Sequence, residues 1–308
     1  MNHTQVARSA RGDWDKTIGD INLARFCSLM DAGYTFQPTQ FLGKLEVFPL
    51  EILQEILMRS DILSIYAFGL ANKSAHGVVA SLPTLKLAKR YFPDVIRAIM
   101  GTRAQHFDLL TLHQALCSNQ PCVTCRSYGG YFHLLRCARV CSHCFTRYTI
   151  FSPIGLPEAM ETTDLSRERL GKIPHISSIP GNYSWLLFSQ LFQDRQPLWD
   201  RTMLNSLSQS KTTSLIGLEK SSFKDRGSEP GRFMSVLPVP WLDPVSGKTD
   251  WGVYCIACEA TSHYMSRKLY TPKGLRDHVS SYGPIIIRSN RPRHSSGQST
   301  QSNLDIFS

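Results

Sequence analysis

Apolar residues recur at helical spacing through residues 45–116. The first group places five large apolar side chains on adjoining sides of one helix: Leu50, Ile52, Leu53, Ile56 and Leu57. Pro49 suits the first turn of that helix, because its missing N–H would have no partner there. Further short apolar groups follow, separated by capping residues such as Asp61 and Asp108. Helices this short are marginal alone, so the pattern predicts several short helices packed on one another.

Beyond residue 150 the pattern is less regular. The apolar residues of 185–192 predict one amphipathic helix, and 233–238 is typical of a short strand. Ser, Thr, Lys and Gly dominate 203–231. The chain therefore divides into a flexible N-terminal arm (1–40), a three-helix unit (45–85), a helical and Cys-rich segment (86–150), a partly helical segment (151–202), a linker or long loop (203–231), a C-terminal Cys/His segment (232–287) and a disordered tail (288–308).

The charge of the chain is unevenly distributed. The formal net charge is +10, and residues 86–147 contain nine Lys/Arg against Asp94 and Asp108. Such an excess favours nucleic acid, anionic membrane or acidic protein partners without choosing among them. Aromatic residues that could stack on bases are interleaved with these charges: Tyr91, Phe92, Tyr128, Tyr131, Phe132 and Tyr148. The alternative interpretation is a solvated basic face with the aromatic residues in a core.

The cysteines indicate metal binding more than disulfides. The N-terminal residues lack the apolar run of a secretory signal, and nowhere do about 20 apolar residues follow one another as a membrane helix requires. We therefore expect a chain of the cytoplasm or nucleus without a membrane partner. Its nine cysteines would then be reduced thiols, and Cys-x-x-Cys pairs among reduced thiols favour a metal site.

Two such pairs form the most specific motif in the chain. Cys122-x-x-Cys125 and Cys141-x-x-Cys144 are fifteen residues apart, which is the spacing of a four-thiolate zinc site. Tetrahedral zinc accepts four ligands with no open position, so this site would be structural. Cys137 is a rival to Cys141 for the same ligand position. Buried free cysteines are the alternative interpretation of the whole group.

A second, less complete metal motif lies near the C-terminus. Cys255-x-x-Cys258 is followed by His278, which supplies three candidate ligands. His263 is a candidate for the fourth ligand, although a lone histidine is more often a hydrogen-bonded structural residue. Motifs for redox, nucleophilic or phosphate-binding chemistry do not accompany either group, so we expect no enzyme.

Residues 45–82 resemble an F-box. The opening Phe48-Pro49-Leu50-Glu51-Ile52-Leu53 stands where that family has Leu-Pro-x-Glu-Ile/Leu-Leu, and two further short apolar helices follow. The likeness extends to a fungal group of F-box proteins that continues into Cys-x-x-Cys, nearby glycines and a Cys-rich turn. That group also carries a Pro-x-Leu-Asp element, a Trp-Gly pair and a C-terminal Cys-x-x-Cys before a His, which here correspond to 240–243, 251–252, 255–258 and His278.

The resemblance implies a fold and a function. The fold expected is mainly α: a three-helix F-box, then short helices, a small irregular zinc knot and a loop-rich α+β C-terminal part. The chain would be a non-catalytic, substrate-recruiting subunit of a cullin–RING ubiquitin ligase, joined to the cullin scaffold through the S-phase-kinase-associated adaptor, with a protein substrate that stays unidentified. The residues expected to contact the adaptor are Phe48, Pro49, Leu50, Ile52, Leu53, Ile56, Leu57, Ile62 and Leu63. A nucleic-acid-binding zinc protein that uses residues 86–147 is the second hypothesis.

Overall fold

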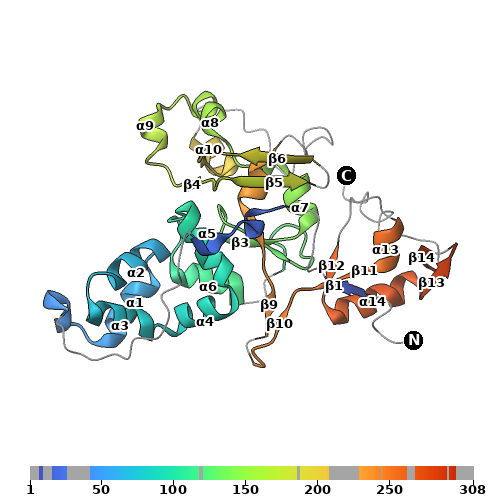
Figure 1. The fold of residues 1–308 in the computed structure, drawn as a ribbon, viewed down its shortest axis with the longest axis horizontal. Coiled ribbons are helices and arrows are strands. Elements are labelled where there is room, and N and C mark those ends of the chain that lie inside the picture. The colour runs from blue at the N-terminus through green and yellow to red at the C-terminus, as the bar shows by residue number, and fades with distance from the viewer. Residues whose placement is uncertain are drawn as a thin grey trace.

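The computed structural model describes residues 7–9, 16–25, 42–117, 121–185, 188–207, 229–243, 245–261, 268–289 and 291–295. Helices from the first half of the chain lie at one end of the molecule, and the last part of the chain lies at the opposite end (Figure 1). Small antiparallel sheets with further helices lie between them. The fold thus combines many short helices with sheets of two or three strands.

Six short helices form the first half of the fold, as the apolar pattern predicts. They are α1 (Leu50–Met58), α2 (Ile62–Gly69), α3 (Lys73–Ser81), α4 (Pro83–Tyr91), α5 (Pro93–Thr102) and α6 (Leu109–Cys117). Side-chain caps set three of the starts: Asp61 accepts from the Ser64 amide, Asn72 from Ala75 and Asp108 from Thr111. Proline occupies the first turn of α4 and of α5. The helices share one apolar core with the central sheet.

Two parts of the N-terminal arm are ordered, while residues 1–6, 10–15 and 26–40 lie outside the described residues. Ala7–Ser9 form strand β1, and two 3-10 turns follow, η2 (Ile18–Asp20) and η3 (Leu23–Arg25). Ile18 and Leu23 are buried in the main core, and Thr17 and Asp20 form a capping box around η2. A third 3-10 turn, η4 (Gly43–Val47), precedes α1. The arm was expected to be flexible because its apolar residues are sparse, but Ile18 and Leu23 pack against core residues far along the chain.

A three-stranded sheet of order β3-β2-β8 occupies the centre. The hairpin of β2 (Tyr131–His133) and β3 (Ala138–Val140) is local, whereas β8 (Val236–Pro238) comes from about a hundred residues later and pairs Phe132 with Leu237. Helix α7 (Ser142–Arg147) follows β3, and α12 (Gly231–Met234) precedes β8. The strand predicted over 233–238 therefore begins only at Val236, after a short helix.

Residues 149–207 contain short helices and two small two-stranded sheets, β4-β7 and β5-β6. The elements are η5 (Thr149–Phe151), α8 (Leu156–Thr163), α9 (Arg167–Leu170), β4 (Ile176–Ser177), β5 (Gly181–Trp185), β6 (Phe188–Phe192), β7 (Pro197–Leu198) and α10 (Arg201–Leu207). The amphipathic helix predicted over 185–192 is wrong, because β5 pairs with β6 in a hairpin. A short apolar run fits either periodicity, and here strand pairing decides.

The last part of the chain forms a C-terminal module, residues 253–295 with β1. A hairpin of β9 (Trp241–Leu242) and β10 (Thr249–Asp250) leads into it (Figure 1). The module contains β11 (Val253–Cys255), α13 (Ile256–Thr261), β12 (Leu269–Tyr270), α14 (Pro272–Tyr282), β13 (Ile285–Arg288) and β14 (Arg291–His294). Strand β1 pairs with β11, so the N-terminal segment belongs to this module.

Two predicted boundaries differ from the structure. Of the tail expected to be disordered (288–308), residues 291–294 form β14, which pairs with β13, while 290 and 296–308 lie outside the described residues. The expected linker 203–231 is helical at its start, where α10 reaches Leu207, and at Gly231, where α12 begins, while 208–228 lie outside the described residues. Within the described part of the chain, no helix is long and apolar enough to cross a bilayer.

Candidate metal centres

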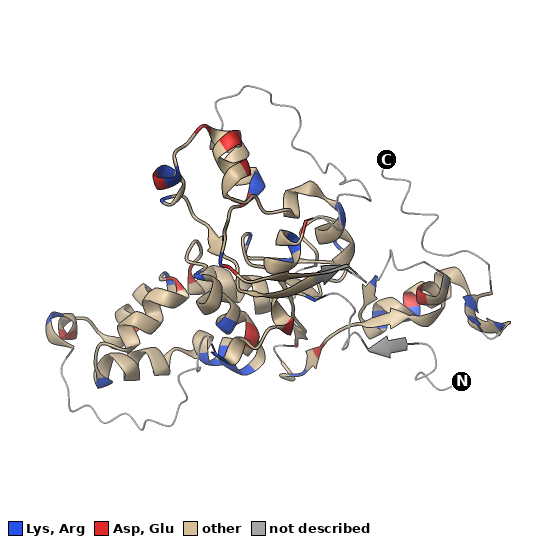
Figure 2. Ribbon diagram, turned by 45° about the horizontal axis from the view of Figure 1, so that its top comes forward, with Lys and Arg blue, Asp and Glu red and all other residues tan. Residues whose placement is uncertain are grey.

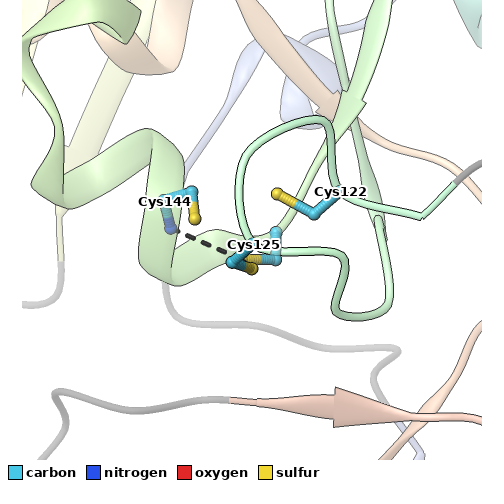
Figure 3. Close-up of side chains that lie close together, drawn as sticks. Cys122, Cys125 and Cys144 are labelled. Atoms are coloured by element: carbon cyan, nitrogen blue, oxygen red, sulfur yellow. Dashed lines mark hydrogen bonds between the residues drawn. The ribbon is translucent and has the colours of Figure 1, made fainter. Parts of the chain in front are cut away.

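The first candidate centre, here called the thiolate centre, contains Cys122, Cys125, Cys141 and Cys144. Their four sulfurs all lie within 4.8 Å of one another, and those of Cys125 and Cys141 are 3.5 Å apart. Cys122 and Cys125 come from the loop before β2, Cys141 follows β3 and caps α7, and Cys144 lies in the first turn of α7. Figure 3 shows Cys122 and Cys125 of the loop close to Cys144 of the helix. The four residues predicted from spacing thus meet, and could hold one metal ion.

Local backbone geometry holds the loop of the thiolate centre. The Cys122 amide donates to the Ser127 carbonyl at 2.7 Å, and the Arg126 amide donates to the Cys122 carbonyl at 3.0 Å. Arg126 has a left-handed backbone (φ 61°), which reverses the chain after Cys125. The Cys144 amide donates to the Cys141 sulfur at 3.4 Å, so that sulfur also caps α7. A sulfur that accepts this bond is oriented toward its three neighbours.

The charge balance of the thiolate centre fits a bound cation. Hydrogen bonding with Cys122 and Cys125 favours the protonated thiols of Cys141 and Cys144 and raises the pKa of both, and burial adds to the effect. The same network, led by Cys122, lowers the pKa of Cys125. Four thiolates this close cannot all be ionised without a compensating positive charge. A divalent cation supplies that charge and deprotonates coordinating thiols.

Neither Cys137, the rival ligand, nor the nearby Cys117 joins this centre. Cys137 is buried in the turn between β2 and β3, where burial and then Asp108 raise the pKa of its thiol. Cys117 ends α6, and burial raises the pKa of that thiol to about 11. The open choice between Cys137 and Cys141 is therefore decided in favour of Cys141.

Arg139 attaches the thiolate centre to the rest of the molecule. Its buried guanidinium donates to the carbonyls of Ala115, Leu116, Gly129 and Pro240 at 2.6–3.1 Å. Two of these carbonyls belong to the last turn of α6, where a helix has no internal donors left. Burial lowers the pKa of Arg139 to about 10, so it stays protonated at neutral pH. Arg139 thus joins the end of α6, the loop that carries Cys122 and Cys125, and the residues between β8 and β9.

The second candidate centre, here called the Cys/His centre, contains Cys255, Cys258, His278 and His294. All four are buried, and their ligand atoms lie within 4.8 Å of one another. The Nε2 atoms of His278 and His294 are 3.1 Å apart, and each lies 3.3–3.5 Å from a cysteine sulfur. The ligands come from the end of β11, from α13, from α14 and from β14. Residues up to 39 positions apart in the sequence thus form a complete set of four donors.

Hydrogen bonds orient the two imidazoles for metal binding. His294 Nδ1 lies 2.8 Å from the Gly283 carbonyl, which can only accept, so Nδ1 carries the proton and Nε2 is left as the ligand atom. His278 Nδ1 lies 3.4 Å from the Tyr270 hydroxyl, and its ring stacks on Tyr270. Hydrogen bonding with Cys258, and then burial, raises the pKa of the Cys255 thiol. As in the thiolate centre, a cation would reverse that shift.

His294 is the site residue that the sequence interpretation missed. It lies in the tail that was expected to be disordered, while His263, the candidate considered for the fourth ligand, lies outside the described residues. The available signal was the apolar run 285–287 followed by Ser289-Asn290, since asparagine is common in two-residue hairpin turns. A returning strand after that turn places a histidine opposite Ile285.

The nine residues expected to contact an adaptor divide into two groups. Leu53, Leu57 and Ile62 are 5%, 7% and 1% exposed, so they stabilise the helical core and are not accessible to a partner. Leu63 is half-buried and packs against the same core. The exposed members are Phe48, Pro49, Leu50, Ile52 and Ile56. The docking surface predicted from the sequence is therefore reduced to the outer side of α1 and the residues before it.

The basic segment 86–147 lacks the exposed aromatic residues that base stacking requires. Four of the six aromatic residues considered for base stacking are buried: Phe92, Tyr128, Tyr131 and Phe132. Tyr128 stacks on Trp241, with ring centroids 4.7 Å apart, and Tyr131 packs on Phe145. Among its basic residues, Arg97 pairs with Asp94, and Arg136 pairs with Asp200. The aromatic residues thus belong to the core beside the thiolate centre.

Comparison with family models, curated proteins and solved structures gives no significant match.

Proposed function

We propose that this chain is a substrate-recruiting subunit of a cullin–RING ubiquitin ligase, whose three-helix unit α1–α3 docks on the S-phase-kinase-associated adaptor. The observation that carries the proposal is a concentration of exposed apolar side chains. Six of the thirteen exposed large apolar residues in the described part of the chain lie within residues 45–56. They are Leu45, Val47, Phe48, Leu50, Ile52 and Ile56. Scattered exposed apolar residues need no explanation, but a contiguous group of them indicates a partner surface.

The geometry of α1 supports this role. Leu53 and Leu57 face the core, while Ile52 and Ile56, one turn apart, are 46% and 50% exposed. Phe48, 43% exposed, lies just before the start of α1. A helix that is apolar on its outer side as well as its inner side gains stability when a second surface covers the outer side. The F-box resemblance of residues 45–82 identifies the adaptor as that surface.

The remainder of the molecule fits a recruiting role without catalysis. The three-helix unit lies at one end and the C-terminal module at the other (Figure 1), so a target bound far from the adaptor would not obstruct docking. The mechanism is proximity, because tethering raises the effective concentration of the target near a ubiquitin-charged enzyme.

We further propose that both centres hold zinc in a structural role. Thiolate and imidazole donors suit zinc, and bonds of about 2.0–2.3 Å in a tetrahedron separate the ligand atoms by about 3.3–3.8 Å. The closest donor atoms in the two centres are 3.1–3.5 Å apart. Four protein donors leave no open position for a substrate or water. The metals would therefore stabilise the fold and carry out no reaction.

The test of the ligase assignment is binding of the full chain to the purified adaptor. The variant Ile52→Asp with Ile56→Asp places two charges on the proposed surface and should weaken binding by about 30-fold or more, as the loss of interface anchors does. The variant Leu191→Asp with Ile287→Asp is the matched control, because both residues are exposed apolar side chains far from α1. Leu53→Asp and Leu57→Asp would not be informative, since they place charges in the core.

Two results would overturn the assignment. One is an unmodified chain that does not bind the adaptor in titration calorimetry. The other is equal binding by the Ile52/Ile56 variant and the unmodified chain, provided that circular dichroism shows the same helix content in both.

A further inference from the structure

A basic face on the C-terminal hairpin is independent of the proposed adaptor surface. Strands β13 and β14 are antiparallel, with Ile286 opposite Arg293 and Arg288 opposite Arg291. Directly opposed residues project from the same side of a sheet, and successive residues alternate between sides. Arg288, Arg291 and Arg293 therefore share one side of the hairpin with Ile286. This side is here called the arginine face.

The other side of the hairpin is anchored to the module at His294, while Ile287 on that side is exposed. This side carries His294 opposite Ile285, and Pro292 opposite Ile287. His294 is a ligand of the Cys/His centre and contacts the Gly283 carbonyl, while the Ser295 amide donates to the Pro284 carbonyl at 2.9 Å. Because successive side chains of a strand alternate between its two sides, the arginine face is on the side opposite His294. The Cys/His centre therefore holds the hairpin in place without covering the arginines.

The arginine face is exposed and lacks neutralising carboxylates. Arg288, Arg291 and Arg293 are exposed, and within the described residues no ion pair joins any of them to an acidic side chain. Arg288 and Arg291 are directly opposed, and like charges in that position destabilise a hairpin. Figure 2 shows basic residues along this hairpin at the end of the molecule. An anionic partner would convert the repulsion into attraction.

The surrounding charge favours an extended polyanion over a single anionic group. Residues 268–295 contain six Lys/Arg and one Asp/Glu. Besides the three arginines these are Lys268, Lys273 and Arg276, all exposed. The charge is thus distributed over the hairpin and α14 rather than concentrated in a pocket. Along β14, Arg291 and Arg293 are about 6.8 Å apart, twice the about 3.4 Å axial rise per phosphate of one DNA strand.

We propose that the arginine face binds the phosphate backbone of nucleic acid. The guanidinium group donates in a fork that matches phosphate oxygens. Neither β13 nor β14 carries an aromatic side chain to stack on bases. Binding is therefore governed by phosphate contacts, with little preference for base sequence. The site differs from the basic segment 86–147, in which Arg97 and Arg136 already have carboxylate partners.

The experiment is fluorescence anisotropy of the full chain with labelled duplex DNA of mixed sequence, over a range of salt concentrations. The variant Arg288→Gln, Arg291→Gln and Arg293→Gln should bind at least about tenfold more weakly at low salt. The slope of log K against log salt should become shallower by about 2–3, because each lost phosphate contact changes it by about 0.9. The matched control is Lys86→Gln, Arg90→Gln and Arg103→Gln, three exposed charges on and after α4 and α5, which should retain most of the affinity and the slope.

Four outcomes would overturn the proposal. The unmodified chain does not bind DNA, or its affinity does not change with salt. The control variant loses as much affinity as the hairpin variant, which would show only the effect of net charge. Unlabelled polyglutamate or vesicles rich in phosphatidylserine compete better than unlabelled DNA, which would indicate an acidic protein or a membrane. Elemental analysis should give the same metal content for both variants. This control shows that the hairpin variant is still folded when its affinity is compared.

Discussion

The two candidate metal centres have the same number of donors but are built differently. The ligands of the thiolate centre lie between residues 122 and 144, and three of its four cysteines are buried in the main apolar core. The ligands of the Cys/His centre lie between residues 255 and 294 and come from two strands and two helices. One centre secures a loop within a large core, whereas the other joins the elements of a small module.

The surroundings of each centre set its contribution to stability. The C-terminal module has a small core of its own, in which two of the five buried residues are the ligands Cys255 and Cys258. Small domains of this size rarely bury enough apolar surface to fold without a metal or disulfides. The segment around the thiolate centre is also held by the central sheet and by Arg139. Loss of metal should therefore unfold the C-terminal module but only loosen the loop that carries Cys122 and Cys125.

The largest expected effect comes from His294→Ala. Structural zinc contributes about 10–16 kcal/mol in small zinc domains, so loss of a ligand should empty the Cys/His centre and unfold the module. Native mass spectrometry should show one metal ion fewer per chain. Limited proteolysis should show new cleavage within 253–295, with α1–α6 still protected.

His263→Ala is the control for that variant, since the sequence alone made His263 a candidate ligand. It should retain its metal content. A chain that keeps both ions after His294→Ala, or loses one after His263→Ala, would contradict the ligand assignment and with it the contrast between the centres.

A smaller effect is expected from Arg139→Met, which tests how the thiolate centre is held. The change leaves four backbone carbonyls without their charged donor, and removing one partner of a buried charged network costs about 3–5 kcal/mol. The midpoint of urea unfolding, followed by tryptophan fluorescence, should fall accordingly. Arg126→Met is the control, because Arg126 is exposed in the same region and should cost less than about 0.5 kcal/mol. Equal midpoints for the two variants would show that the centre does not depend on this attachment.

The effect of each unit of pH is smaller, and it concerns a core histidine that is not one of the metal ligands. Burial, followed by Arg136, lowers the pKa of His133 to about 3 from the ordinary 6.5. The unfolded chain therefore binds the proton more readily. The contribution of His133 is complete above pH 6.5 and is lost as the pH falls toward 3, by about 1.4 kcal/mol per pH unit.

The variant His133→Leu should remove this contribution. Its urea midpoint should depend less on pH between 6.5 and 4 than that of the unmodified chain, measured in parallel at each pH. Acid also protonates the metal ligands of both centres. The contribution of His133 must therefore be subtracted before the loss of metal from the two centres at low pH is compared. If the urea midpoints of the two proteins change with pH in the same way, His133 is not a buried neutral group in the folded chain.

Local features of the chain were predictable from sequence, whereas pairing across distance was not. The Cys-x-x-Cys turns place two sulfurs together by local geometry, so the thiolate centre was found from spacing. Caps such as Asp61 and Asp108 act within three residues, and the starts of α2 and α6 were found in the same way. The hairpin β5–β6 and the strand β14 were not found, because a short apolar or polar run fits several conformations until a partner selects one.

The sequence by itself determined the series of short helices, the four cysteines of the thiolate centre and the three-helix unit, whose first helix has apolar residues on adjoining sides. Only the tertiary structure decided that Leu53 and Leu57 are buried while Ile52 and Ile56 are exposed, because periodicity places side chains around a helix but packing chooses the side that is covered. It likewise decided that His294 completes the second centre and that three arginines share one face. The reason is the same in both cases: strand register, set by contacts between residues distant in the chain, determines which side chains meet.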